Sequence, residues 1–338
     1  MNIILMDRKR YAGVLCLFFL FFLVTIAITP LIGSIQIDLE KAFSKDLAFN
    51  DNVDANILFL ARIPRIILAA LTGAALSIAG AVLQSLLRND LAAPFTLGVS
   101  SGAALGAVIA MSLGLPHAIL GIPTVPIAAF LGALGAITLV FSLARTRTGE
   151  FPTSVLLLAG VTANFFFAAL VMLIHYLSDF TQSFRIVRWL MGGLDITSYK
   201  TLISISPMIF IGFGVLMVFS RDLNVISTGI QSAISRGVEV VKVQKIGFIM
   251  ASLLTGAVVA LSGPIGFVGL IVPHIVRLMV GPDLRILLPA SMFFGASFLV
   301  MCDTLARTII APTEIPVGII TAMLGGPFFV WLLKRPKA

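Results

Sequence analysis

Three arginines stand beside long apolar segments, where a charged side chain is costly unless it has a role. Arg62 and Arg65 come just before one such segment, and Arg307 lies near the end of another. An arginine there can anchor a helix by reaching back to water, or it can pair with acidic groups of a partner protein. Asp303 lies four residues before Arg307, so we expect these two side chains to pair on one helix face. A cationic rim for an acidic partner is the first candidate site.

No other group of residues has the spacing of a catalytic or metal site. The three histidines lack a second ligand at metal spacing, so we expect no metal. His274 is interpreted as a polar residue at a bend rather than a proton relay. Cys16 and Cys302 lie in apolar runs, and we expect inert buried thiols. The phosphate-binding pattern GxxxxGK followed by Ser or Thr is absent, so ATP hydrolysis and ATP itself would belong to a partner, and no cofactor is expected.

The composition requires a membrane around this chain. Of its 338 residues 59% are hydrophobic and 11% are charged, and the mean hydropathy is +1.10. Apolar runs of about 20 residues recur along the chain, and each could cross a hydrocarbon layer roughly 30 Å thick as a helix. The sequence therefore predicts an all-α polytopic membrane protein. Its net charge of +8 is then explained by membrane topology rather than by nucleic-acid binding.

Ten transmembrane helices are predicted. They cover residues 11–32, 62–87, 96–113, 125–143, 153–177, 202–219, 243–261, 268–280, 287–310 and 316–333. The first is too long for a signal-peptide core and lacks a clear cleavage site, so we expect it to be retained. Pro64 is expected to mark the start of the second helix, where its missing N–H costs nothing. Basic residues favour an orientation with both termini in the cytoplasm.

The longest polar interruption between two spans covers residues 221–245. Four basic residues in it indicate the cytoplasmic side: Arg221, Arg236, Lys242 and Lys245. Gly229, Ala233 and Gly237 recur every four residues, which on a helix would place three small residues on one face. We expect this face to receive a partner's surface.

An inverted repeat is a further sign of transport. Residues 71–80 and 254–263 both begin Leu-Thr-Gly-Ala and end in Gly, and they lie in the second and seventh predicted helices, which run antiparallel. Inverted repeats are common in transporters and place the pathway at their interface. An ion-coupled secondary transporter therefore stays open as an alternative, with Asp303 as its main candidate ion carrier. An intramembrane enzyme would need paired catalytic groups, which the sequence lacks.

Residues 263–277, with the sequence GPIGFVGLIVPHIVR, resemble the signature of the FecCD family, the permease subunits of ABC importers for iron siderophores, haem and vitamin B12. Five further stretches agree in order: 62–65 (RIPR), 88–94 (RNDLAAP), 97–100 (LGVS), 156–161 (LLLAGV) and 314–318 (EIPVG). The resemblance implies a type II ABC importer permease, with residues 1–338 as one transmembrane domain. It also implies a bacterial or archaeal cytoplasmic (inner) membrane, two ATP-binding cassette subunits, an extracytoplasmic substrate-binding protein and a second permease copy or homologue.

The resemblance also assigns roles to residues. Arg62, Arg65 and Arg307 would receive acidic residues of the binding protein. Thr153, Ser154, Asn89 and Leu91 would form the cytoplasmic gate. Gly229, Ala233, Arg236 and Gly237 would seat the coupling loop, residues 221–245, on the ATPase.

Two positions depart from the family pattern. Asp90 replaces the usual proline beside the gate, and no acidic residue follows Gly229. The resemblance implies ATP-driven import of a metal chelate or corrinoid by alternating access and leaves the particular substrate open.

Overall fold

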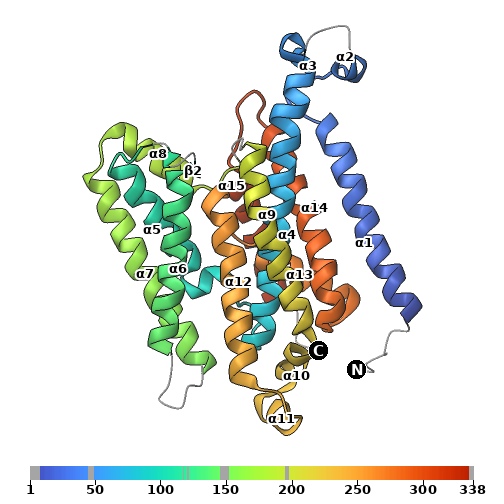
Figure 1. The fold of residues 1–338 in the computed structure, drawn as a ribbon, viewed down its shortest axis with the longest axis vertical. Coiled ribbons are helices and arrows are strands. Elements are labelled where there is room, and N and C mark those ends of the chain that lie inside the picture. The colour runs from blue at the N-terminus through green and yellow to red at the C-terminus, as the bar shows by residue number, and fades with distance from the viewer. Residues whose placement is uncertain are drawn as a thin grey trace.

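The structure is a computed structural model, and it describes residues 8–44, 49–116, 118–119, 122–144, 152–194 and 198–334. Within these ranges the chain is a helical bundle with one short β-hairpin (Figure 1). Seven helices are long and apolar enough to cross a membrane, and three apolar helices are shorter. The ten predicted transmembrane helices are therefore all present as apolar helices.

The ten apolar helices are α1 (Arg8–Ile28), α4 (Ile63–Leu87), α5 (Val99–Ser112), α6 (Thr124–Ala144), α7 (Thr153–Leu177), α9 (Tyr199–Val218), α12 (Val240–Ser262), α13 (Val268–Val280), α14 (Leu284–Thr308) and α15 (Val317–Lys334). The shorter elements are η1 (Thr29–Leu31), α2 (Leu39–Phe43), η2 (Phe49–Asp51), α3 (Val53–Asn56), η3 (Ile57–Arg62), η4 (Pro94–Leu97), β1 (Ala118–Ile119), β2 (Ile122–Pro123), α8 (Phe180–Leu190), α10 (Ser220–Thr228) and α11 (Ile230–Ser235).

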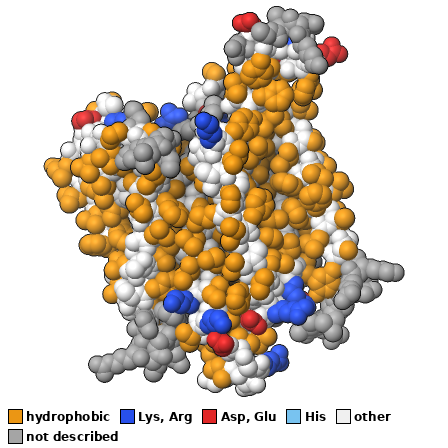
Figure 2. Space-filling model, viewed as in Figure 1, with side chains coloured by type: hydrophobic (Ala, Val, Ile, Leu, Met, Phe, Trp, Pro, Cys, Tyr) orange, Lys and Arg blue, Asp and Glu red, His pale blue; other side chains and the backbone are white. Residues whose placement is uncertain are grey.

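The short helices mark the two ends of the bundle (Figure 1). At one end lie α2, α3 and α8, with the start of α4 and the end of α14; we call this the arginine end. At the other lie α10 and α11, with the start of α1 and the end of α15; we call this the α10–α11 end. Hydrophobic side chains cover most of the visible flank, and charged ones gather toward the two ends (Figure 2). A membrane would therefore surround the flank.

The second apolar helix begins earlier than predicted. Residues 53–87 form one continuous helix through α3, η3 and α4, and Asn52 caps its start by accepting a hydrogen bond from the Ala55 N–H at 3.1 Å. Pro64 stands in the first turn of α4, as predicted, but the helix already runs through α3 and η3 before it. The wide π-helical turn of η3 comes just before this proline, and such turns accommodate a break in the hydrogen-bond ladder.

The centre of the bundle is α4, which packs closely against its neighbours through glycines. A Cβ added to Gly73 would overlap the carbonyl oxygen of Gly295 in α14, and one added to Gly80 would overlap that of Gly269 in α13. Small residues let helix backbones approach in this way when hydrophobic burial in lipid cannot hold them together. The repeated stretches lie along α4 and α12, which are antiparallel and are the two most buried of the long spans.

Candidate functional site

The arginine end holds a buried ion-pair network. The Arg65 guanidinium donates from Nε and Nη2 to the Asp303 carboxylate at 3.0 and 2.9 Å, and from Nη1 to Glu314 Oε2 at 2.6 Å. Arg307 donates from Nε to Asp303 Oδ2 at 3.1 Å, so the pairing predicted within α14 is confirmed. The Asp303 side chain is 1% exposed. Arg65 therefore joins α4 to α14 through this carboxylate, which Arg307 of α14 also contacts.

Arg62 lies at the same end but makes a different set of contacts. It is buried and donates to the backbone oxygen of Pro30 at 2.6 Å and to that of Ile35. These contacts tie the segment after α1 to the start of α4. With Arg65, Arg307, Asp303 and Glu314, this group contains three cations and two anions, so it carries one net positive charge.

The structure thus brings the three predicted arginines to one end, but with their side chains mostly buried rather than exposed as a rim. The Arg65 side chain is 12% exposed and that of Arg307 is 6% exposed. No local pattern predicted the Arg65–Asp303 pair, because its members are 238 positions apart. Asp303 is also a poor ion carrier, because its oxygens are already held by two arginines.

At the α10–α11 end, two of the four predicted gate residues, Asn89 and Leu91, lie in the segment between α4 and α5. Arg88 adopts a left-handed conformation that ends α4, and the Asn89 side chain then accepts a hydrogen bond from the Leu91 N–H at 2.9 Å. This Asn turn redirects the chain and leaves the Leu91 side chain 50% exposed. Asn89 and Leu91 therefore form a defined surface turn.

Asn164 fixes this segment to α7, the helix that begins with Thr153 and Ser154. Its side chain donates to the Phe95 carbonyl and accepts from the Ser101 hydroxyl, both at 2.6 Å. One helical turn earlier, a Cβ on Gly160 would overlap the Thr96 carbonyl, so η4 lies directly against α7. The two predicted gate segments thus belong to one packed unit. Sequence reasoning missed Asn164, although an amide inside an apolar run is a usable signal.

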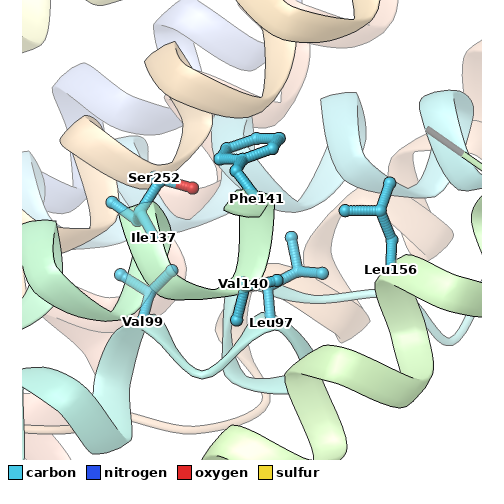
Figure 3. A pocket seen from close by; sticks show the side chains of 7 residues that line it. All are labelled: Leu97, Val99, Ile137, Val140, Phe141, Leu156 and Ser252. Carbon is cyan, nitrogen blue, oxygen red and sulfur yellow. The ribbon is translucent and has the colours of Figure 1, made fainter. Parts of the chain in front are cut away.

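Apolar packing completes this unit (Figure 3). A small void of about 10 Å³ lies between η4, α5, α6, α7 and α12, with room for about one water. Its lining residues are Leu97, Val99, Ile137, Val140, Phe141, Leu156 and Ser252. The void is too small and too apolar for a ligand, so these side chains serve to position the start of α7.

Asp90, the departure from the family pattern, has a partner in α13. Its carboxylate accepts from Arg277 Nη1, and Arg277 Nη2 donates to the Gln84 side chain at 2.9 Å. The Gln84 amide in turn lies 3.4 Å from the Gly269 oxygen and 3.3 Å from the Leu270 oxygen. The end of α4, the gate turn and α13 are therefore joined by one chain of polar contacts.

The predicted small-residue face at residues 229–237 is wrong. Gly229 has φ 141° and Gly237 has φ 78°, so both lie outside α11 and interrupt the helix on either side. Ala233 is fully buried against the bundle. The loop is instead two short helices, α10 and α11, and its exposed residues include Ile234 and Arg236.

A second polar group fastens α10 to α14. Asp283 accepts from the Asn224 amide at 2.7 Å, from the Tyr11 hydroxyl at 3.1 Å and from Arg285, while Asn224 accepts from the Leu284 N–H at 2.8 Å. Burial raises the pKa of Asp283, but these hydrogen bonds outweigh it and lower the pKa from 3.8 to about 2. The carboxylate therefore stays charged and holds α1, α10 and α14 together.

Metal chemistry has no support among the described residues, which contain no group of three His, Cys, Asp or Glu side chains able to hold an ion. Cys302 is buried as expected, whereas Cys16 is exposed on α1, so the prediction of two buried thiols is wrong for Cys16.

Comparison with known proteins decides the family. A model of the FecCD transport family matches residues 19–335. The chain belongs to the FecCD transport family. Three relatives illustrate the match. The uncharacterised ABC transporter permease YvrB of Bacillus subtilis is 41% identical over 97% of this chain and 95% of its own. The hemin transport permease HmuU of Yersinia pestis is 41% identical over 82% of each chain. The cobalamin import permease BtuC of Halobacterium salinarum is 43% identical over 88% of this chain and 78% of its own.

The fold of this FecCD protein is also that of solved transporters. A metal-chelate type ABC transporter in an inward-facing conformation matches with a TM-score of 0.82 and 31% identity, over 96% of this chain and all of the other. PsaBC from Streptococcus pneumoniae shares only the fold, with a TM-score of 0.55 and 14% identity over 84% of this chain and 95% of the other.

This FecCD protein is therefore a multi-pass membrane permease of an ABC importer. Permeases of this kind act with ATP-binding cassette subunits, which hydrolyse the ATP, and with a second permease. The prediction that the chain is a transport subunit without its own ATPase is thus confirmed by its family.

Proposed function

We propose that this permease imports a metal chelate, such as a ferric siderophore or haem, or a corrinoid. The observation that carries the proposal is the near full-length similarity to permeases named for hemin and cobalamin, with 82% and 88% of this chain covered. The fold shared with a metal-chelate type transporter adds support. Cargo of this class is too large for a narrow ion pathway, so movement of helices rather than coordination by a few side chains would carry it.

The arginine end is the proposed docking site of a substrate-binding protein, and it would face outward. The support is the convergence of Arg62, Arg65 and Arg307 there and the net positive charge of their network. Long-range attraction from such a charge would orient an acidic partner before contact, even with the arginines buried. Both termini would then lie in the cytoplasm of a bacterium or archaeon, on the side of α10 and α11.

The α10–α11 end is the proposed cytoplasmic gate and coupling site. Thr153, Ser154, Asn89 and Leu91 would border the exit, and α11 with Arg236 would contact the ATPase. Support comes from the polar links that run from α10 to α14 and from the gate turn to α13. These links give a movement of α10 a mechanical route into the bundle.

Uptake in reconstituted vesicles tests the proposal. Permease, ATPase and binding protein are assembled in liposomes, and accumulation of a radiolabelled iron chelate or cobalamin is measured with ATP and an ionophore present. We expect uptake that needs ATP and survives the ionophore. Failure to accumulate any member of the class would overturn the proposed cargo, and uptake that collapses with the ionophore would indicate a gradient-driven transporter.

Two controls in the same vesicles address the proposed sites. If docking is electrostatic, added salt should raise the binding-protein concentration that is needed for half-maximal uptake. An Arg236→Glu variant should lose substrate-stimulated ATP hydrolysis, and unchanged hydrolysis would remove Arg236 from the coupling site.

A further inference from the structure

A large cleft lies at the arginine end, and the roles assigned above do not use it. Its volume is about 890 Å³, within the range of small-molecule sites. One wall is α8, and the other is formed by the end of α12 and by residues 313–317 before α15. Arg65 and Glu314 of the ion-pair network also line it, so the cleft lies directly beside the proposed docking site.

The sequence of α8 explains why this wall is built as it is. Asp179 caps the helix by accepting from the Gln182 N–H at 2.8 Å, and Ile186 is fully buried against α5 and α7. The opposite face, at helical spacing, is left to line the cleft. It carries Phe184, Arg185, Val187, Arg188 and Trp189, and Met191 follows just beyond the end of the helix.

The base of the cleft is fixed by backbone contacts. The Gly193 N–H donates to the Ser262 carbonyl at 2.9 Å, and the Gly318 N–H donates to the Gly192 carbonyl at 3.2 Å. A Cβ on Gly318 would overlap the Met191 carbonyl, so the two walls meet without intervening side chains. The cleft is therefore a preformed space between rigid elements.

The lining combines positive charge with aromatic and apolar surface. Its described residues include three arginines and one glutamate, and that glutamate already pairs with Arg65. On this helix Arg188 lies one turn after Phe184, and Trp189 lies one turn after Arg185. A guanidinium binds carboxylates in a two-pronged geometry, while aromatic rings cover a flat apolar body. A neutral solute would use only the second feature.

We propose that this cleft is a selectivity site for anionic metal chelates with an apolar body, in which Arg185 and Arg188 bind the anionic groups and Trp189 contacts the body. The inference rests on the proposed function and narrows its cargo by charge. Its position beside Arg65 places it where cargo released by a docked binding protein would enter. The same two arginines would disfavour cationic chelates.

Fluorescence of Trp189 gives a direct test. The chain has two tryptophans, so a Trp331→Phe variant leaves Trp189 as the only indole. The complete permease–ATPase complex in nanodiscs of zwitterionic lipid, without binding protein, is titrated with haemin. We expect saturable quenching, little response to cyanocobalamin as an uncharged chelate, and an apparent Kd that rises with salt. Arg185→Gln and Arg188→Gln should each raise the Kd about tenfold.

Matched variants separate the outcomes. Lys200→Gln removes an exposed basic residue outside the cleft lining and should leave the Kd unchanged. Trp189→Phe, with Trp331 retained, should abolish the saturable signal. Equal Kd values in Arg185→Gln, Arg188→Gln and Lys200→Gln would overturn the proposal, as would full competition by phosphatidylglycerol, which would identify a lipid site. If ATP-driven uptake persists in those cases, the proposed function stands; if wild-type vesicles import no chelate at all, the proposed function itself fails.

Discussion

At the arginine end, Asp303 is 1% exposed and its carboxylate is shared by Arg65 and Arg307. At the α10–α11 end, Asp90 is 61% exposed and pairs with Arg277, whose side chain is 18% exposed. Both are ion pairs between distant parts of the chain. Their energies differ because a buried charge has lost its water, while an exposed one can exchange its partner for water at little cost. The Asp303 network is therefore expected to stay formed, whereas the Asp90–Arg277 pair can break and re-form.

This difference fits the tasks proposed for the two ends. A docking surface needs a fixed shape, whereas a gate must change shape in each cycle. The buried network fixes α4 against α14, two helices already in close contact through Gly73 and Gly295. The Asp90–Arg277 pair joins the gate turn to α13 across exposed surface. The comparison therefore predicts large stability effects at one end and functional effects with small stability changes at the other.

The largest effect is expected from Asp303→Asn. Removing this charge leaves Arg307 buried without its carboxylate and weakens the hold on Arg65, so the free energy of unfolding should fall by about 3–5 kcal/mol. Thermal unfolding of the purified protein in detergent measures the loss. Glu314→Gln is the matched control, because its side chain is 48% exposed and its loss should cost about 1 kcal/mol or less. Equal effects of the two variants would contradict the distinction between a buried and an exposed carboxylate.

The contrast also shows what could be predicted from sequence. Hydropathy found all ten apolar helices, because about 20 apolar residues in a row have few alternatives to crossing a membrane. The pairing of Asp303 with Arg307 followed from a spacing of four. The Arg65–Asp303 and Asp90–Arg277 pairs could not be foreseen, since their members are 238 and 187 positions apart and only the packed bundle brings them together.

Local patterns misled where backbone conformation overruled spacing. Gly229 and Gly237 have the spacing of a helix face, but glycine adopts positive φ readily and here ends one helix and follows another. Pro64 is in the first turn of α4, but the π-helical turn before it extends the helix back to Val53, which the proline alone did not predict. Glycine and proline thus indicated an unusual backbone conformation at these positions, but not which conformation it would be.

A smaller effect on stability is expected from the Asp90–Arg277 pair. Asp90→Asn and Arg277→Gln should each change the free energy of unfolding by about 1 kcal/mol or less, with a double-mutant coupling of similar size. Both should nevertheless alter the coupling between ATP hydrolysis and uptake, because the gate turn loses its link to α13. The ratio of ATP hydrolysed to substrate imported measures this.

Lys41→Gln is the control for that experiment, since Lys41 and Asp38 form an exposed pair within a single stretch of chain at the other end of the bundle. It should change neither stability nor the ratio. A destabilisation by Arg277→Gln as large as that of Asp303→Asn would show that both ends are permanently fastened. An unchanged ratio in both Asp90→Asn and Arg277→Gln would show that the pair does not act on the gate.

A pH-dependent effect sharpens the comparison within the α10–α11 end itself, where Asp283 is more buried than Asp90. Its pKa is lowered from 3.8 to about 2, so its charged form favours the folded state. This contribution is complete above about pH 4 and is lost as the pH falls through 2. The difference in melting temperature between wild type and Asp283→Asn should therefore be constant near neutral pH and shrink in acid, whereas an Asp90→Asn variant should show a much smaller difference throughout. A difference for Asp283→Asn that does not change with pH would mean that the hydrogen bonds of Asn224 and Tyr11, rather than the charge they stabilise, hold α10 to α14.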